Sequence, residues 1–257
     1  MSMWKAIRVA ILLLILAVVA INRLQEQRSL NWQQRFYVGV YPINVDHSPV
    51  VQQYIDGLHA GDFGQIASHL NGEAQRYGVA LSSPIQVQLG PQIADVPPAP
   101  PQDSSLVKVI LWSLKLRYYA WTHNPKMPVR PNVRLYLLYY DPAQYKRLSH
   151  STALNNGRVG RVNVFASTKQ ADQNLVVIAH ELLHTFGATD KYDLGTNLPF
   201  FPTGYAAPQQ VPLYPQQAAE LMGGRVPVSE QKAVMPESLR QVLVGDLTAR
   251  EIGWVKQ

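Results

Sequence analysis

The stretch VVIAHELLHTFGATD, residues 176–190, constrains the fold of this chain more than any other segment. It ends a longer apolar run, and its periodicity predicts a helix that stops at Gly187. His180 and His184 stand four residues apart, so both imidazoles leave the same face of that helix. Apolar neighbours surround them, where an unpaired polar group is costly. This setting argues against the alternative, a solvated helix that contains histidine by chance.

The residues after the helix add a carboxylate to the two imidazoles. Gly187 can adopt the left-handed conformation that reverses the chain, and the reversal brings Asp190 back toward the histidines. Two histidines and one carboxylate leave a fourth position for water, which is the pattern of a catalytic rather than a structural zinc ion. Glu181 is rotated by about 100° from His180, where it can take a proton from that water. The chain contains no cysteine, so only histidine and carboxylate can hold a metal.

The segment HELLHTFGATD resembles the zinc-binding consensus of the metzincin clan of metallopeptidases. It is similar to the variant with aspartate in place of the third histidine, as in the snapalysin and immune inhibitor A families. The Asp-x-Tyr common in those families matches the tripeptide that ends at Tyr192. The resemblance implies His180, His184 and Asp190 as zinc ligands and Glu181 as the general base.

The same resemblance implies a methionine in a tight turn beneath the metal. Met222 in AAELMGGRVP precedes two glycines that permit such a turn, and Met235 in KAVMPESL is the alternative. Either methionine could instead simply fill the core. Glu220 is an alternative third ligand, in the manner of peptidases whose third ligand is a distant glutamate. A C-terminal helix is expected in VGDLTAREIGW, with three packing residues: Leu247, Ile252 and Trp254.

From residue 30 onward the chain is expected to form one α/β (α+β) unit. The resemblance implies a metzincin-like zincin fold, with a twisted, mostly parallel sheet, an antiparallel edge strand and the active-site helix. It divides the zinc metallopeptidase domain 30–257 into an upper subdomain of about 30–187 and a smaller lower subdomain of about 188–257. Composition and periodicity predict strands at 35–45, 84–90, 132–140 and 158–167, and helices at 49–58, 62–77, 105–121 and 168–186, the last capped by Ser167 with Gln170.

Two segments have no counterpart in the small snapalysin scaffold. One is the helix 105–121, which is predicted because five large residues recur at helical spacing: Val107, Ile110, Leu111, Leu114 and Tyr118. The other is the loop 193–215, which is rich in proline and aromatic residues and forms either a substrate-binding wall or lid, or a packed connection. Three tyrosines in or next to that loop are candidates to stabilise the oxyanion: Tyr192, Tyr205 and Tyr214.

The first 29 residues form a separate segment. Lys5 and Arg8 precede an uncharged apolar run, residues 9–21, whose length suits the core of a signal peptide with cleavage after Ala20. An uncleaved signal anchor is the alternative, and a buried helix of the folded domain is a third. The first two interpretations place the rest of the chain outside the cytoplasm, either anchored to the membrane or secreted or periplasmic.

Charge and motif together define the expected function. Half of the formal net charge of +6 comes from residues 1–29, and the remainder is too small and scattered to suggest nucleic-acid binding. We therefore expect an exported or membrane-tethered zinc endopeptidase that binds a peptide along the strand 158–167, taken as the edge of the sheet. The alternatives are a non-proteolytic zinc domain that binds peptides and a zinc amidase acting on a non-protein amide, such as a cell-wall crosslink.

Overall fold

The computed structural model describes residues 32–101, 103 and 105–255, together with positions 4, 5, 8, 9 and 13. Apart from those five positions, the expected signal peptide or signal anchor, including Ala20, lies outside the described residues. Within the described part of the chain, no helix is both long and apolar enough to cross a membrane.

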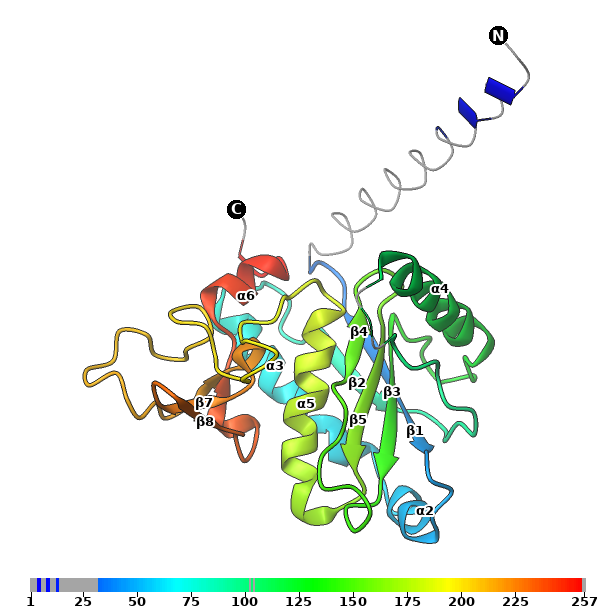
Figure 1. The fold of residues 1–257 in the computed structure, drawn as a ribbon, viewed down its shortest axis with the longest axis horizontal. Helices are drawn as coiled ribbons and strands as arrows, with labels where there is room; N and C mark the ends of the chain where they lie inside the picture. The colour runs from blue at the N-terminus through cyan, green and yellow to red at the C-terminus, as the bar shows by residue number, and fades with distance from the viewer. Residues whose placement is uncertain are drawn as a thin grey trace.

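A five-stranded sheet forms the centre of the fold, with the strand order β2-β1-β3-β5-β4 (Figure 1). Four strands run parallel, and β4 pairs with β5 in the antiparallel direction. The fold is therefore mixed α/β with a mostly parallel sheet, as expected. The central strands are nearly continuous apolar runs, which is typical of parallel strands that are covered on both faces. The strands are β1 (Phe36–Asn44), β2 (Ile85–Leu89), β3 (Val133–Tyr140), β4 (Thr152–Leu154) and β5 (Val159–Phe165).

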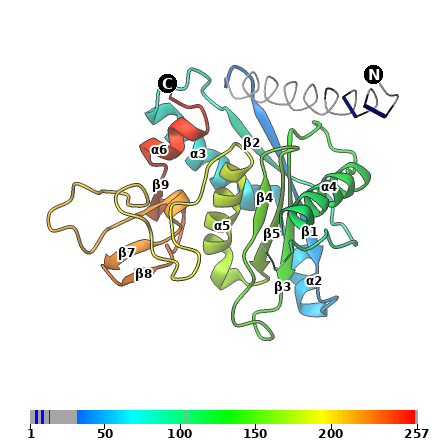
Figure 2. The same ribbon diagram turned by 45° about the horizontal axis from the view of Figure 1, so that its top comes forward.

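Helices cover both faces of this sheet (Figures 1 and 2). On one face, α5 (Ala171–His184) and α3 (Gly64–Arg76) pack on alternate strand residues such as Val40 and Leu137, and α2 (Pro49–Asp56) joins the same core. On the other face, α4 (Leu106–Thr122) packs on the intervening strand residues, among them Tyr136. Two separate apolar cores result from this alternation along the strands.

The predicted helices and strands lie within a few residues of those observed. The predicted helix 62–77 divides into the 3-10 turn η1 (Ala60–Phe63) and α3, and the predicted helix 168–186 divides into η2 (Thr168–Gln170) and α5. The predicted capping box at Ser167 was wrong, because the Ser167 side chain makes no capping hydrogen bond.

The assignment of residues 158–167 as the edge strand was also wrong. The chain reverses just before β5, and β4 pairs with β5 from Thr152 opposite Arg161 to Leu154 opposite Val159. β5 is therefore an interior strand, and β4 forms the edge of the sheet. A single strand's alternation is the same in either position, so the sequence could not distinguish them.

The C-terminal part consists of short elements around the end of α5. Ile252 and Trp254 are buried as predicted, but Leu247 is 40% exposed, so its predicted packing role was wrong. The short helix that contains Leu247 buries Thr248 and Ala249 instead. The elements are β6 (Ala219–Glu220) paired with β9 (Val242–Leu243), β7 (Val226–Ser229) paired with β8 (Lys232–Val234), the turns η3 (Leu221–Gly223) and η4 (Leu239–Gln241), and α6 (Asp246–Glu251).

An aromatic cluster joins the start of the domain to its end. The Trp32 ring lies edge-on to Phe36 and Phe186, with 4.9 Å between centroids in each case, and 5.9 Å from Trp254. The Trp32 indole also donates a hydrogen bond of 2.7 Å to the Ile252 carbonyl. Trp32 thus closes the core beneath α6.

Replacing Trp32 with alanine is expected to lower the free energy of unfolding by about 3–5 kcal/mol, because it opens a cavity between three aromatic rings. Trp121→Ala is the matched control, since Trp121 is 75% exposed, and it should change the free energy by no more than about 0.5 kcal/mol. Urea unfolding followed by far-UV circular dichroism measures both. Equal stability of the two variants would contradict this account of the cluster.

Candidate metal centre

The end of α5 is built to reverse the chain beside its own histidines. Gly187 has φ of 99°, a conformation that side chains rarely tolerate, and its backbone N–H reaches the His184 carbonyl at 3.0 Å. The Ala188 N–H bonds the Leu183 carbonyl at 3.1 Å, which completes the helix termination. This turn confirms the reversal that was predicted at Gly187 and directs the following residues back along α5.

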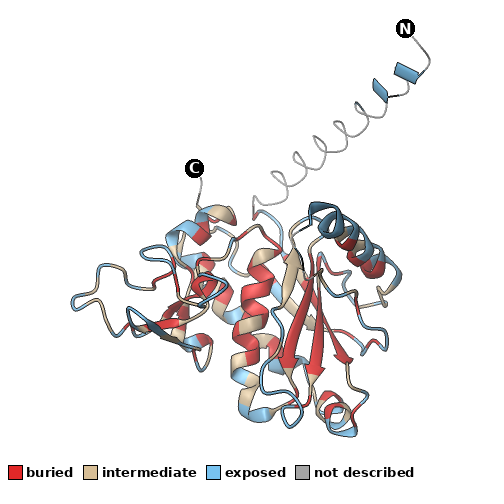
Figure 3. Cartoon of the chain, in the orientation of Figure 1, coloured by how far each residue is buried: buried red, intermediate tan, exposed pale blue. Residues whose placement is uncertain are grey.

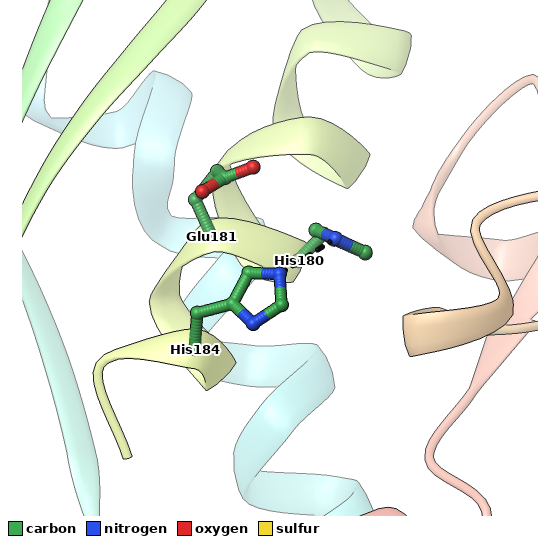
Figure 4. A group of neighbouring side chains, drawn as sticks. All are labelled: His180, Glu181 and His184. Atoms are coloured by element: carbon green, nitrogen blue, oxygen red, sulfur yellow. Dashed lines mark hydrogen bonds between the residues drawn. The ribbon is translucent and has the colours of Figure 1, made fainter. Parts of the chain in front are cut away.

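Three donor atoms converge on one point as a result. The Nε2 atoms of His180 and His184 lie 3.1 Å apart, and Asp190 Oδ1 lies 3.1 Å from the first and 3.2 Å from the second. Tetrahedral zinc with bonds of about 2.0–2.1 Å would hold its ligand atoms about 3.3–3.4 Å apart. The three predicted ligands are therefore spaced to bind a single cation. Figure 4 shows the two imidazole rings of this group with Glu181 beside them.

Each imidazole is oriented by a backbone carbonyl. His180 Nδ1 lies 2.8 Å from the Leu221 carbonyl oxygen, and His184 Nδ1 lies 2.8 Å from the Ala188 carbonyl oxygen. A carbonyl can only accept, so both Nδ1 atoms carry a proton, and the Nε2 atoms are the ones that face the position of a metal. Such outer hydrogen bonds are the usual support of metal-binding histidines.

The charges and hydrogen bonds of the cluster favour a proton on His180 and an ionised carboxylate on Asp190. Burial by itself lowers the pKa of His180, but the hydrogen bond that its ring donates to Asp190 and the charges of Glu181 and Asp190 outweigh burial and raise this pKa to about 9. Burial raises the pKa of Asp190, yet the hydrogen bonds from His180 and His184 more than offset it and hold that pKa below its usual range. A metal ion must therefore displace a proton from His180.

Glu181 is the buried acid next to these ligands. Its side chain is almost fully buried, and its Oε2 atom has no hydrogen-bond partner among the described residues. Burial raises its pKa, although the charges of His180 and His184 act in the opposite direction. A buried carboxylate oxygen without a hydrogen-bond partner is costly. A water molecule bound to the metal would donate the missing hydrogen bond to Glu181.

The turn predicted around Met222 adjoins the ligands directly. Met222 is buried in η3, its carbonyl accepts a hydrogen bond of 2.8 Å from the Lys191 N–H, and the carbonyl before it orients His180. Gly224 follows with φ of 71°, which only glycine adopts easily. Met235, the alternative, is half-buried and lines the neighbouring cavity instead.

Glu220, the alternative third ligand, points away from the histidines. Its carboxylate accepts hydrogen bonds from the backbone N–H groups of Gly223 at 2.7 Å and Gly245 at 3.0 Å, and from the Thr248 hydroxyl at 2.8 Å. These bonds join η3 to the start of α6. In this arrangement Glu220 stabilises the turn that carries Met222, and Asp190 is the carboxylate that reaches the histidines.

A buried ion pair that the sequence analysis missed supports the ligand loop. Lys191 Nζ lies 2.6 Å from Glu251 Oε2 and 2.7 Å from the Thr189 carbonyl, and the Thr189 N–H bonds Glu251 at 3.0 Å. Both neighbours of Asp190 are thus tied to α6. No local pattern could have shown this, because the pair is 60 residues apart in the chain.

Of the three candidate tyrosines, only Tyr192 adjoins the cluster. Its ring centroid lies 6.1 Å from that of His180, and burial together with the charges of Asp190 and Glu181 raises its pKa, which keeps the hydroxyl protonated. Tyr205 and Tyr214 share a hydrogen bond of 2.8 Å with each other, and neither lines the cavity beside the cluster.

A cavity of about 460 Å³ opens beside His180 and Glu181. The first half of α5 and β5 form its floor, residues 146–151 form one wall, and Tyr192, the turn 223–225 and Met235 form the other. Of the loop 193–215, only Asn197 lines this cavity, so most of the loop is a connection rather than a wall of this cavity. Three basic side chains also border it: Lys146, Arg147 and Arg225.

No known protein family and no curated protein matches this chain. Among solved structures, a chain described as "Structure of a chaperone-substrate complex" aligns with 87% of this chain at 12% identity and a TM-score of 0.36. The present chain spans 36% of that chain's length. A likeness at this level carries no conclusion about fold or activity.

Removing the third donor should abolish tight zinc binding. Asp190→Ala is expected to weaken zinc affinity by about 100-fold or more, since even outer-shell substitutions cost about 10–100-fold. Glu220→Gln, the control, should keep one zinc per chain while lowering stability by about 1–3 kcal/mol, because its amide N–H₂ would face backbone donors. Metal analysis after dialysis and chelator competition measure both. Zinc lost from Glu220→Gln but retained by Asp190→Ala would reverse the assignment.

Zinc binding should depend on pH through His180. Its pKa is raised to about 9, so below that pH zinc must displace its proton, and the apparent affinity should fall about tenfold per unit as the pH decreases. Asp190→Ala removes the main group that raises the pKa and should move the onset of this slope to lower pH. Chelator competition between about pH 6 and 9.5 tests this. Constant affinity across that range would contradict it.

Proposed function

We propose that this protein is a zinc-dependent endopeptidase with a metzincin-like catalytic domain. The observation that carries the proposal is the position of Glu181, which lines a cavity beside three convergent donors and has a buried Oε2 atom without a hydrogen-bond partner among the described residues. A purely structural metal site has no use for an unpaired buried carboxylate at that position. Together with the open fourth position, this arrangement favours hydrolysis by an activated water.

Each residue of the site has a separate role in the proposed peptide hydrolysis. Bound zinc would lower the pKa of a water and polarise the scissile carbonyl. Glu181 accepts the proton of the attacking water and returns it to the amine nitrogen of the leaving group. Its raised pKa brings this carboxylate closer to the range in which it can both accept and donate. Tyr192 adjoins His180 and remains protonated, so its hydroxyl would donate to the developing oxyanion.

We further propose that an extended peptide lies in the cavity beside residues 146–151, next to the β4 edge. Those residues line the cavity, whereas β5, the strand first expected to pair with substrate, is covered by β4. The N-terminal sequence supports export of the catalytic domain, tethered by residues 1–29 or released by cleavage after Ala20.

Replacing Glu181 with glutamine should separate chemistry from metal binding. The variant is expected to keep one zinc per chain and to lose about 10²–10⁴-fold in the rate of peptide cleavage, the usual contribution of a general base. Glu237→Gln is the matched control, because Glu237 is an exposed glutamate outside the cavity, and it should leave the rate unchanged. Cleavage of a diverse peptide mixture, read by mass spectrometry with a chelated sample alongside, measures the rate.

The outcomes separate the candidate functions. Cleavage that survives in Glu181→Gln would overturn the role of Glu181, and cleavage that survives chelation would overturn the zinc mechanism. A folded, zinc-loaded wild-type protein that cleaves no peptide would favour the alternatives, a zinc-containing peptide-binding domain or an amidase acting on a non-protein amide.

A further inference from the structure

Helix α4 has two apolar faces, and the described residues of the chain cover only one of them. Four residues pack on the sheet: Trp112, Leu116, Tyr119 and Ala120. The opposite face is exposed along the whole helix, from Leu106 at 77% to Trp121 at 75% (Figure 3). That face holds the residues whose spacing predicted the helix: Val107, Ile110, Leu111, Leu114 and Tyr118. A continuous apolar face of this size marks an interaction surface.

We propose that α4 docks the domain onto the surface of an anionic lipid bilayer. With 17 residues the helix is about 25 Å long, less than the hydrocarbon thickness of about 30 Å, and its other face is bound to the sheet. It therefore cannot span a bilayer. It lies in the plane of the interface, with its exposed side chains in the boundary between headgroups and acyl chains.

The composition around this face fits a lipid surface better than a second protein. Residues 103–130 carry five basic side chains and one acidic side chain, Asp103, which already pairs with Lys108. Tyr118 and Trp121 lie next to each other at the end of the helix, with ring centroids 5.9 Å apart, and both are residues that favour the membrane interface. The basic residues are Lys108, Lys115, Arg117, Lys126 and Arg130.

α4 also lies near the point where the chain enters the domain at Trp32. The Arg117 side chain lies against Gly157, where an added Cβ would meet its Cδ at 3.2 Å, and the guanidinium of Arg158 lies 4.7 Å from the Phe36 ring centroid. α4 therefore lies at the end of the sheet where the chain enters the domain (Figure 1). Only residues 22–31 separate the apolar run from Trp32, a reach of at most about 40 Å.

Docking through α4 leaves the candidate metal centre accessible. α4 and α5 lie on opposite faces of the sheet (Figure 2), and no residue of α4 lines the cavity beside His180. The cavity would then open away from the lipid surface. This inference does not depend on the proposed peptidase activity.

The absence of cysteine allows a test in the full chain. Single substitutions Leu111→Cys and Leu114→Cys, labelled with an environment-sensitive dye, place a probe on the exposed face of α4. Val50→Cys is the matched control, since Val50 is 55% exposed and lies on α2, against 52% for Leu114. Each labelled protein is mixed with vesicles of phosphatidylcholine and phosphatidylglycerol, with and without a quencher attached to the acyl chains. Far-UV circular dichroism checks that each variant folds.

The dye at positions 111 and 114 is expected to shift to shorter emission wavelength and to be quenched, while the dye at position 50 shows neither change. Vesicles of phosphatidylcholine alone should give a several-fold smaller response. Probes on α4 that behave like position 50 would overturn the proposal. A shift that needs no vesicles and grows with protein concentration would also overturn it, in favour of a second copy of the chain. An equal response in neutral vesicles would overturn the preference for anionic lipid.

Discussion

The convergence of two imidazoles and one carboxylate at the end of α5 is the constraint on which the rest of the site depends. Three donor atoms within 3.2 Å of one another require a helix that ends one turn after His180 and a chain that reverses at Gly187. Such a cluster is costly inside an apolar core, because its charges are removed from water. A bound cation would offset this cost through direct bonds to all three donors.

The parts of the molecule around the cluster hold those donors in place. The carbonyl of Leu221 orients His180, and η3, which contains it, is fastened to α6 by the buried carboxylate of Glu220. The pair of Lys191 and Glu251 fastens the loop that carries Asp190 to the same helix. The C-terminal elements are short, and much of their role is to supply these supports. A metal ligand is only as well placed as the groups that orient it.

Much of the fold could be predicted from local patterns. The strands and helices follow from periodicity, and the candidate ligands follow from the spacing of His180, His184 and Asp190 around Gly187. The predictions that were wrong concerned features that depend on contacts with residues distant in the chain. The edge of the sheet was misplaced because a short hairpin strand, β4, carries almost no pattern of its own. The helix α4 was found from five apolar residues, yet those residues face outward, since periodicity shows that a face is apolar and not what covers it.

The sequence by itself determined the candidate chemistry of this protein. Histidine, glutamate and aspartate at helical and turn spacing define a candidate metal site, because that spacing acts within a few ångströms along one chain segment. The tertiary structure alone decided that Tyr192 adjoins the site, that Glu220 stabilises the turn next to it, and that β4 forms the edge of the sheet. It also decided that α4 presents an uncovered apolar face. These features depend on contacts between residues tens of positions apart, whose pairing is chosen by the packing of the whole core and leaves no local pattern.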